Sequence, residues 1–251
     1  MLATQTSVTP EQVVDFTRTA APYLWGLWLS VLLAQPLMVS ENRKYSLQLY
    51  KQVRPRNIGS ALLVVVFTFA AYFMISAAVP VLDFSWISLM SSGGSSGDEG
   101  TNVLIAPATL PILGPIFIAL LVFNMPLITS LEERLFRGGT RSYLGAIPRS
   151  LIFGLAHCLV GVPVAAGLAL AIPGMWFSRA YMAGEKDHPA DYTGLEHKLP
   201  RLSRIPLART IGKQMVCAEG GGVRRAALAH TCYNTTLLTI ASSLLIIAYT
   251  Y

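Results

Sequence analysis

The chain has 251 residues, of which 53% are hydrophobic and only 13% are charged, and its formal net charge is +6. Soluble domains carry about 25% charged residues, so this composition excludes an ordinary soluble globular protein. It predicts an all-α, polytopic integral membrane protein that is in contact with the lipid bilayer.

The first 20 residues contain no basic stretch followed by an apolar run, so no signal peptide is expected there. Thr9 offers a helix cap, and Pro10 follows it at the first helical position. We therefore expect a short N-terminal surface segment over 1–20 and one integral membrane domain over 21–251.

Six apolar windows follow, and each approaches the roughly 20 residues that a bilayer crossing requires. They cover 21–40, 58–82, 104–128, 142–161, 162–182 and 226–249. Gly161 and Pro163 stand between the fourth and fifth windows and predict a turn there. The sequence thus predicts a helical bundle with about six transmembrane or membrane-embedded helices.

The polar connections differ in charge. The 83–103 segment is rich in Ser and Gly and has no Lys or Arg, which is typical of a flexible external connection. Basic residues concentrate in 43–56, in 134–149 and in a long basic insertion at about 183–225. Since cytoplasmic loops carry the excess of Lys and Arg, we expect these three segments on the cytoplasmic side of a bacterial-type cell membrane. The same rule accounts for the positive charge without a nucleic-acid partner.

Glu132, Glu133 and Arg137 follow one another at the end of a long apolar stretch. Residues four apart on a helix share a face, so Glu133 and Arg137 are expected to form an ion pair. Glu132 is turned about 100° away from Glu133. Its carboxylate is therefore left to face another group.

Two histidines lie inside apolar segments further along the chain. His157 comes four residues after Phe153, and Asn234 comes four residues after His230, so each pair shares a helix face. Ionisable residues at membrane depth point to a functional site. A carboxylate, two imidazoles and a carboxamide supply a base for water and donors for an oxyanion. This set favours hydrolysis, with Phe153 as a packing residue.

In order, these motifs resemble the EExxxR, FxxxH and HxxxN motifs of the CPBP intramembrane proteases, the CAAX-protease and bacteriocin-processing (ABI) family. That family includes prokaryotic homologues of the prenyl-protein CAAX endopeptidase. The resemblance covers about 104–249. It implies an all-helical intramembrane endopeptidase whose active site opens to the cytoplasm.

The resemblance also implies roles for individual residues. Glu132 would activate water as the general base, and His157 would hold the same water. His230 and Asn234 would stabilise the oxyanion, with Glu133 and Arg137 in support. The substrate would be a membrane-associated or CAAX-like peptide or protein. Whether it is prenylated stays open, because the insertion at 183–225 and six spans in place of eight depart from the family pattern.

The sequence leaves the metal question open. Two histidines and a glutamate can ligate zinc, and the set would then be Glu132, His157 and His230. No HExxH helix is present, and Asn234 is a poor zinc ligand. We therefore favour a glutamate mechanism without a cofactor.

Two other functions fit part of the pattern. A scaffold derived from a protease would bind partners in the same cavity without cleaving them. A small proton-coupled transporter would use the buried Glu and His residues as a relay. Against transport, the two halves of the chain show no repeat symmetry, and the polar groups gather near one membrane face.

Overall fold

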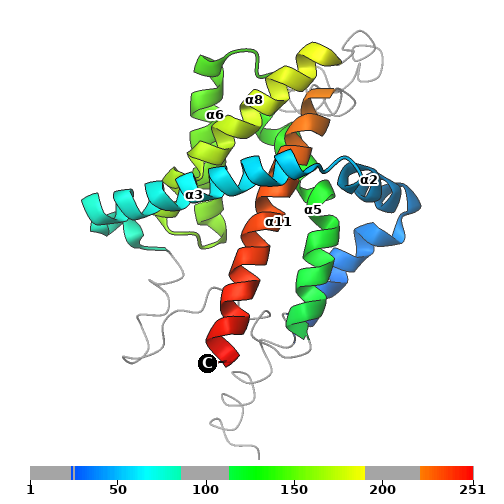
Figure 1. Ribbon diagram of the computed structural model, residues 1–251, viewed down its shortest axis with the longest axis horizontal. Coiled ribbons are helices and arrows are strands. Elements are labelled where there is room, and N and C mark those ends of the chain that lie inside the picture. The colour runs from blue at the N-terminus through cyan, green and yellow to red at the C-terminus, as the bar shows by residue number, and fades with distance from the viewer. Residues whose placement is uncertain (1–23, 25, 86–112, 190–220, 251) are drawn as a thin grey trace, which may run out of the picture. The chain divides into compact units, whose positions relative to one another are not determined.

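The structure, a computed structural model, describes residues 24, 26–85, 113–189 and 221–250 (Figure 1). Within these ranges the regular secondary structure is entirely helical, as the composition predicts. The helices include α2 (Ser40–Tyr50), α3 (Pro55–Ala78), η1 (Pro80–Asp83), α5 (Leu113–Arg137), α6 (Tyr143–Ala156), η3 (His157–Val160), α7 (Val164–Ala169), α8 (Ala171–Asp187) and α11 (Gly221–Thr250). The predicted surface segment over 1–20, most of the 83–103 connection and most of the basic insertion lie outside the described residues.

Three of the described helices are long and apolar enough to cross a membrane. They are α3, the Gly114–Arg137 part of α5, and Tyr143–Val160, which combines α6 with η3. A further apolar helix, Gly26–Met38, is shorter. The prediction of a helical protein with membrane-spanning segments is supported, whereas six spans are not confirmed.

The expected fifth span shows why the number differs. Its window, 162–182, contains two helices, α7 with 6 residues and α8 with 17, and Leu170 lies between them. A helix of 17 residues is about 26 Å long, slightly less than the roughly 30 Å hydrocarbon core. The described part of the expected third span is α5, which extends beyond that window to Arg137 and therefore contains the two adjacent glutamates.

The predicted turn between α6 and α7 is confirmed. Gly161 ends η3 with φ of 92°, a left-handed conformation that favours glycine, and Pro163 caps the start of α7. A second glycine controls how closely these helices pack. A Cβ atom on Gly154 would lie 2.0 Å from the carbonyl oxygen of Gly167. Only a residue without a side chain permits this approach.

The chain divides into two compact units, 1–42 with 101–124 and 43–100 with 125–251. In the first unit, the Asn124 carboxamide donates hydrogen bonds to the carbonyl oxygens of Leu33 and Leu120, at 2.7 and 2.8 Å. The bond to Leu33 connects α5 to the helix Gly26–Met38. Every candidate site residue belongs to the second unit.

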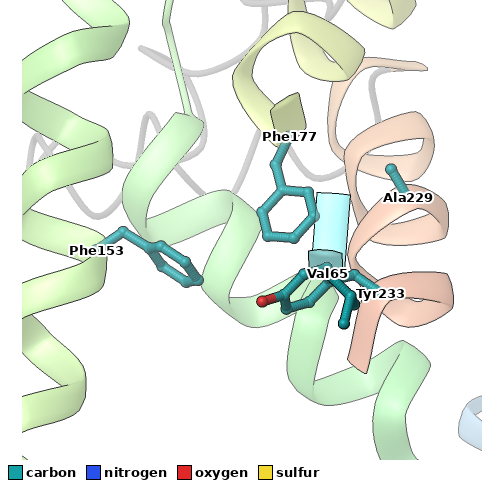
Figure 2. Packing of buried hydrophobic residues seen from close by; sticks show 5 residues of the cluster. All are labelled: Val65, Phe153, Phe177, Ala229 and Tyr233. Carbon is teal, nitrogen blue, oxygen red and sulfur yellow. The ribbon is translucent and has the colours of Figure 1, made fainter. Parts of the chain in front are cut away.

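The core of the second unit forms where α8 and α11 pack together, with α3 against both of them and α6 against α8. Five buried residues from these four helices form the central cluster shown in Figure 2: Val65, Phe153, Phe177, Ala229 and Tyr233. Phe153 and Phe177 pack edge to face, with their ring centroids 6.0 Å apart. This aromatic core holds the candidate site described below.

Candidate active site

The two adjacent glutamates lie in the last two turns of α5 and differ in burial. The side chain of Glu133 is fully buried, whereas that of Glu132 is 28% exposed. The Nε atom of Arg137 lies 3.4 Å from Oε2 of Glu133, and both side chains are inaccessible to solvent. The ion pair expected from their spacing is therefore confirmed, and Glu132 faces another partner.

That partner is His230, on α11. Its Nδ1 atom lies 2.8 Å from Oε1 of Glu133, a hydrogen bond that the imidazole donates because a carboxylate only accepts. Its Nε2 atom lies 3.4 Å from Oε2 of Glu132. One buried imidazole thus stands between the two carboxylates, and it joins the first predicted motif to the last.

Arg137 is the largest fully buried side chain of the described residues. The central carbon of its guanidinium group lies 4.0 Å from the ring centroid of Phe153, close enough for a cation–π interaction. Its Nη2 atom donates to the carbonyl oxygen of Gly174 at 3.4 Å. The cation is therefore held by a carboxylate, an aromatic ring and a carbonyl, which offset part of its loss of hydration, while its Nε and Nη1 atoms make no hydrogen bond within the described residues.

Aromatic rings enclose the imidazole of His230. The ring of Phe177 stacks on it, with centroids 4.1 Å apart and an interplanar angle of 21°. Phe153 meets it edge to face at 5.4 Å. Sequence analysis interpreted Phe153 correctly as a packing residue but did not identify Phe177. Nothing in the sequence marks that residue, because it lies in α8 outside the three motifs.

His157, the first residue of η3, also contacts the ring of Phe153. Its ring centroid lies 4.8 Å from that of Phe153. Its Nδ1 atom lies 2.8 Å from the carbonyl oxygen of Phe153, one helical turn earlier. Since a carbonyl only accepts, Nδ1 carries the proton, and the Nε2 atom keeps a lone pair that can accept from water. His157 is half-buried.

Asn234 lies one turn beyond His230 on α11 and is half-buried. Its Nδ2 atom donates to the sulfur of Met125 at 3.4 Å, and a thioether is a weak acceptor. Its carboxamide is therefore held loosely. A stronger acceptor, such as a developing oxyanion, can compete for the same N–H group.

A buried pair of hydroxyl groups connects α5 to α11 next to this cluster. The Oγ1 atoms of Thr129 and Thr231 lie 2.9 Å apart, and Thr129 also lies 3.3 Å from the carbonyl oxygen of Ala227. Thr129 lies about one helical turn before Glu132 and Glu133, and Thr231 directly follows His230. The pair fixes the relative height of these two helices. Sequence analysis missed it, since isolated threonines in apolar helices carry no distinctive pattern.

The residues suggested as zinc ligands do not gather into a closed ligand set. Among the described residues, no three His, Cys, Asp or Glu side chains form a group that could hold a metal ion. Glu132 and His230 are neighbours, and the Nδ1 atom of His157 is bound to the carbonyl oxygen of Phe153, which leaves its Nε2 atom as the nitrogen that could ligate.

One oxygen of each glutamate lacks a hydrogen bond. Within the described part of the chain, Oε2 of Glu132 and Oε2 of Glu133 are buried and accept no hydrogen bond. Buried polar atoms are nearly always hydrogen-bonded, and exceptions in native proteins call for an explanation such as a catalytic role or a water molecule. Of the two side chains only that of Glu132 is partly exposed, and its Oε2 atom lies 3.4 Å from Nε2 of His230.

Comparison of the chain with protein-family models, with curated proteins and with solved structures finds no match in any of the three. The class of the protein is therefore described from its fold and its site alone. It is a helical protein with apolar, membrane-length helices around a buried cluster of two carboxylates, an imidazole and a guanidinium group.

Proposed function

We propose that this protein is an intramembrane endopeptidase of the glutamate type, related to the CPBP family, which hydrolyses a peptide bond in a membrane-associated or CAAX-like substrate. The observation that carries the proposal is the position of His230 between Glu132 and Glu133. The imidazole and the glutamates are 97 or more residues apart in the chain. Their convergence in a buried cluster is difficult to explain by packing alone, because buried charges are costly.

The charges of the cluster support different roles for the two glutamates. Glu133 is committed twice, to Arg137 and to Nδ1 of His230. Glu132 is the more exposed carboxylate, and its one charged partner in the cluster is Nε2 of His230 at 3.4 Å. When His230 carries protons on both nitrogens, its positive charge and that of Arg137 balance the two carboxylates. Glu132 is thus the group able to take a proton from water.

The reaction then proceeds by attack of water on the scissile carbonyl carbon. Glu132 accepts one water proton as the oxygen–carbon bond forms, and Nε2 of His157 accepts a hydrogen bond from the same water. General-base assistance of this kind contributes about 10²- to 10⁴-fold. The stacked and edge-on rings of Phe177 and Phe153 keep bulk water away from the imidazole of His230.

The carbonyl oxygen becomes an oxyanion in the tetrahedral intermediate. The Nε2–H group of His230 and the Nδ2–H group of Asn234, which leaves the sulfur of Met125, donate to it. Loss of one such donor costs about 10²- to 10³-fold in an acyl-transfer enzyme. The carbon–nitrogen bond then breaks, Glu132 gives its proton to the leaving amine, and a carboxylic acid and an amine are released; the acid then loses its proton to solvent.

Cleavage of a quenched fluorescent peptide library by the purified full-length protein in detergent tests the proposal. The library includes farnesylated peptides with a C-terminal CAAX sequence. We expect cleavage by the wild type, and a loss of at least about 100-fold in Glu132→Ala and in His157→Ala. His188→Ala, which removes an exposed histidine at the end of α8, is the matched control and retains activity.

Each variant must elute as the wild type does in size-exclusion chromatography, so that loss of activity is not loss of fold. Cleavage that persists in a chelator supports the metal-free mechanism. Full activity of a folded Glu132→Ala protein contradicts the proposed base. A wild type that is folded and cleaves no peptide favours the scaffold.

One observation favours a second candidate, a proton-coupled transporter. Glu132, His230 and Glu133 form a continuous line of groups that can exchange protons. Reconstituted vesicles with an internal pH dye distinguish the two functions. A transporter acidifies or alkalinises the lumen when its solute is supplied, whereas a peptidase leaves the luminal pH unchanged and releases peptide fragments.

A further inference from the structure

A second polar site lies in the same compact unit, outside the glutamate–histidine cluster. It is a cavity of about 590 Å³ between the end of α2, the start of α3, α8 and α11. Its size falls in the ordinary range for small-ligand sites, about 300–1,000 Å³. Five of the residues that line it are basic, and none is acidic: Lys51, Arg54, Arg56, Arg179 and Arg225.

These positive charges are largely uncompensated within the described part of the chain. Arg225 pairs with Asp187 at 2.6 Å, on an exposed part of the surface. No other described carboxylate forms an ion pair with a basic residue of the cavity. Like charges gathered in one cavity repel each other, and a bound anion relieves the repulsion.

The start of α3 adds to the positive potential of this basic cavity. Arg54 caps the helix, its backbone N–H donates to Oδ1 of Asn57 at 2.9 Å, and Pro55 occupies the first helical position. Asn57 and Ser60, in the first two turns, both line the cavity. The N-terminal end of a helix carries a partial positive charge and attracts anions such as phosphate.

The rest of α3 indicates where such an anion comes from. This helix is the most apolar of the three candidate spans, with a mean hydropathy of 2.3. Large apolar side chains along it are exposed, including Leu63, Val66, Phe67 and Phe73 at 57 to 63%. Such a surface suits contact with acyl chains. Trp176 lines the cavity, and tryptophan is favoured at the level of lipid headgroups.

We infer that the basic cavity binds the phosphate-bearing headgroup of an anionic phospholipid, whose acyl chains lie along the exposed face of α3. Basic pockets between membrane helices are known to recognise such headgroups. A soluble phosphate compound would use the same cations but would leave the adjoining apolar face without a partner. This inference does not depend on peptidase activity.

Binding of fluorescent phosphatidylglycerol to the purified full-length protein, in uncharged detergent micelles, tests the inference by anisotropy. The test variant, Arg56→Gln with Arg179→Gln, removes two exposed cations of the cavity. The matched control, Arg141→Gln with Lys186→Gln, removes two exposed cations elsewhere. Each cation near a membrane surface contributes about 1 kcal/mol, so we expect the test variant to bind roughly 30-fold more weakly and the control to bind as the wild type does.

Three competitors identify the ligand class. We expect unlabelled phosphatidylglycerol to displace the probe, and phosphatidylcholine with the same acyl chains, or inorganic phosphate at millimolar concentration, to leave it bound. Displacement by inorganic phosphate overturns the assignment to a lipid in favour of a free anion. Displacement by a CAAX peptide carrying a free carboxylate assigns the cavity to substrate instead. Equally weakened binding in the test and control variants would show that the probe binds through unspecific surface charge and would overturn the inference.

Discussion

At the scale of single residues, the site depends on an asymmetry between two adjacent glutamates. Helical geometry alone turns Glu132 away from the ion pair of Glu133 and Arg137, and the sequence was sufficient to predict this. The sequence could not show that His230 hydrogen-bonds to the buried Glu133 and also approaches Glu132. Contacts between helices that are far apart in the chain depend on packing, which no local spacing encodes.

The contribution of the buried ion pair to stability can be tested by first removing one charged partner and then neutralising the other. Arg137→Met leaves Glu133 buried without its cation, and the loss of one partner of a buried pair costs about 3–5 kcal/mol. Adding Glu133→Gln removes the uncompensated charge and keeps the hydrogen bond to Nδ1 of His230. We expect the double variant to regain part of that free energy of unfolding in a denaturation by sodium dodecyl sulfate. A double variant less stable than Arg137→Met contradicts the ion-pair account.

At the scale of elements, close helix contacts position the site. Gly154 follows Phe153 directly, and its backbone touches that of Gly167 on α7. On α8, Gly174 contacts Ser150 of α6 in the same way. These contacts bring α6 near enough to α8 and α11 for Phe153 to reach His230. Small residues at helix interfaces are typical of membrane bundles, where close backbone approach supplies van der Waals attraction.

The glycine contact gives a test with a matched control. Gly154→Ala places a methyl group about 2.0 Å from a backbone oxygen that cannot move aside, so α6 and α7 must separate. Overpacking of this kind typically costs about 1–3 kcal/mol. Gly59→Ala, in α3, meets no atom within 4 Å and should be neutral or stabilising. Thermal unfolding in detergent measures both variants, and equal midpoints in the two would refute the role given to Gly154.

Comparison of the predicted spans with the observed helices shows which features sequence patterns can determine. Long apolar windows predicted α3, α6 and the helical class correctly, and Gly161 with Pro163 marked the turn after η3. The split of 162–182 at Leu170 was not predicted, although Pro173 lies in the first turn of α8 and has no N–H group to bond the carbonyl oxygen of Ala169 in α7. Predicted spans also assume that every apolar helix crosses the bilayer. Packing against other helices can bury a shorter one such as α8, with Phe177 and Tyr181 fully inside.

At the scale of the whole molecule, a crossing by α3, which is long and apolar enough to span a membrane, would place the basic cavity on one side of it. Gln48 and Val81 are exposed and lie before and after this helix. In a background without cysteine, we expect Val81→Cys to react with an impermeant thiol reagent added to intact cells. Gln48→Cys should react only after permeabilisation, because its neighbours are basic and cytoplasmic loops are enriched in Lys and Arg. Equal labelling of both positions from outside would show that α3 does not cross.

The most direct test of the central claim compares Glu132→Gln with Glu133→Gln on one cleavable peptide under single-turnover conditions. Both substitutions are isosteric and remove one negative charge from the cluster. We predict that Glu132→Gln slows cleavage by about 10²- to 10⁴-fold at unchanged stability, because the base is lost. Glu133→Gln should retain more activity and lose stability, because Arg137 is left buried without its counter-charge. The reverse order, or equal cleavage by Glu132→Gln and the wild type, would contradict the assignment of Glu132 as the base that activates water.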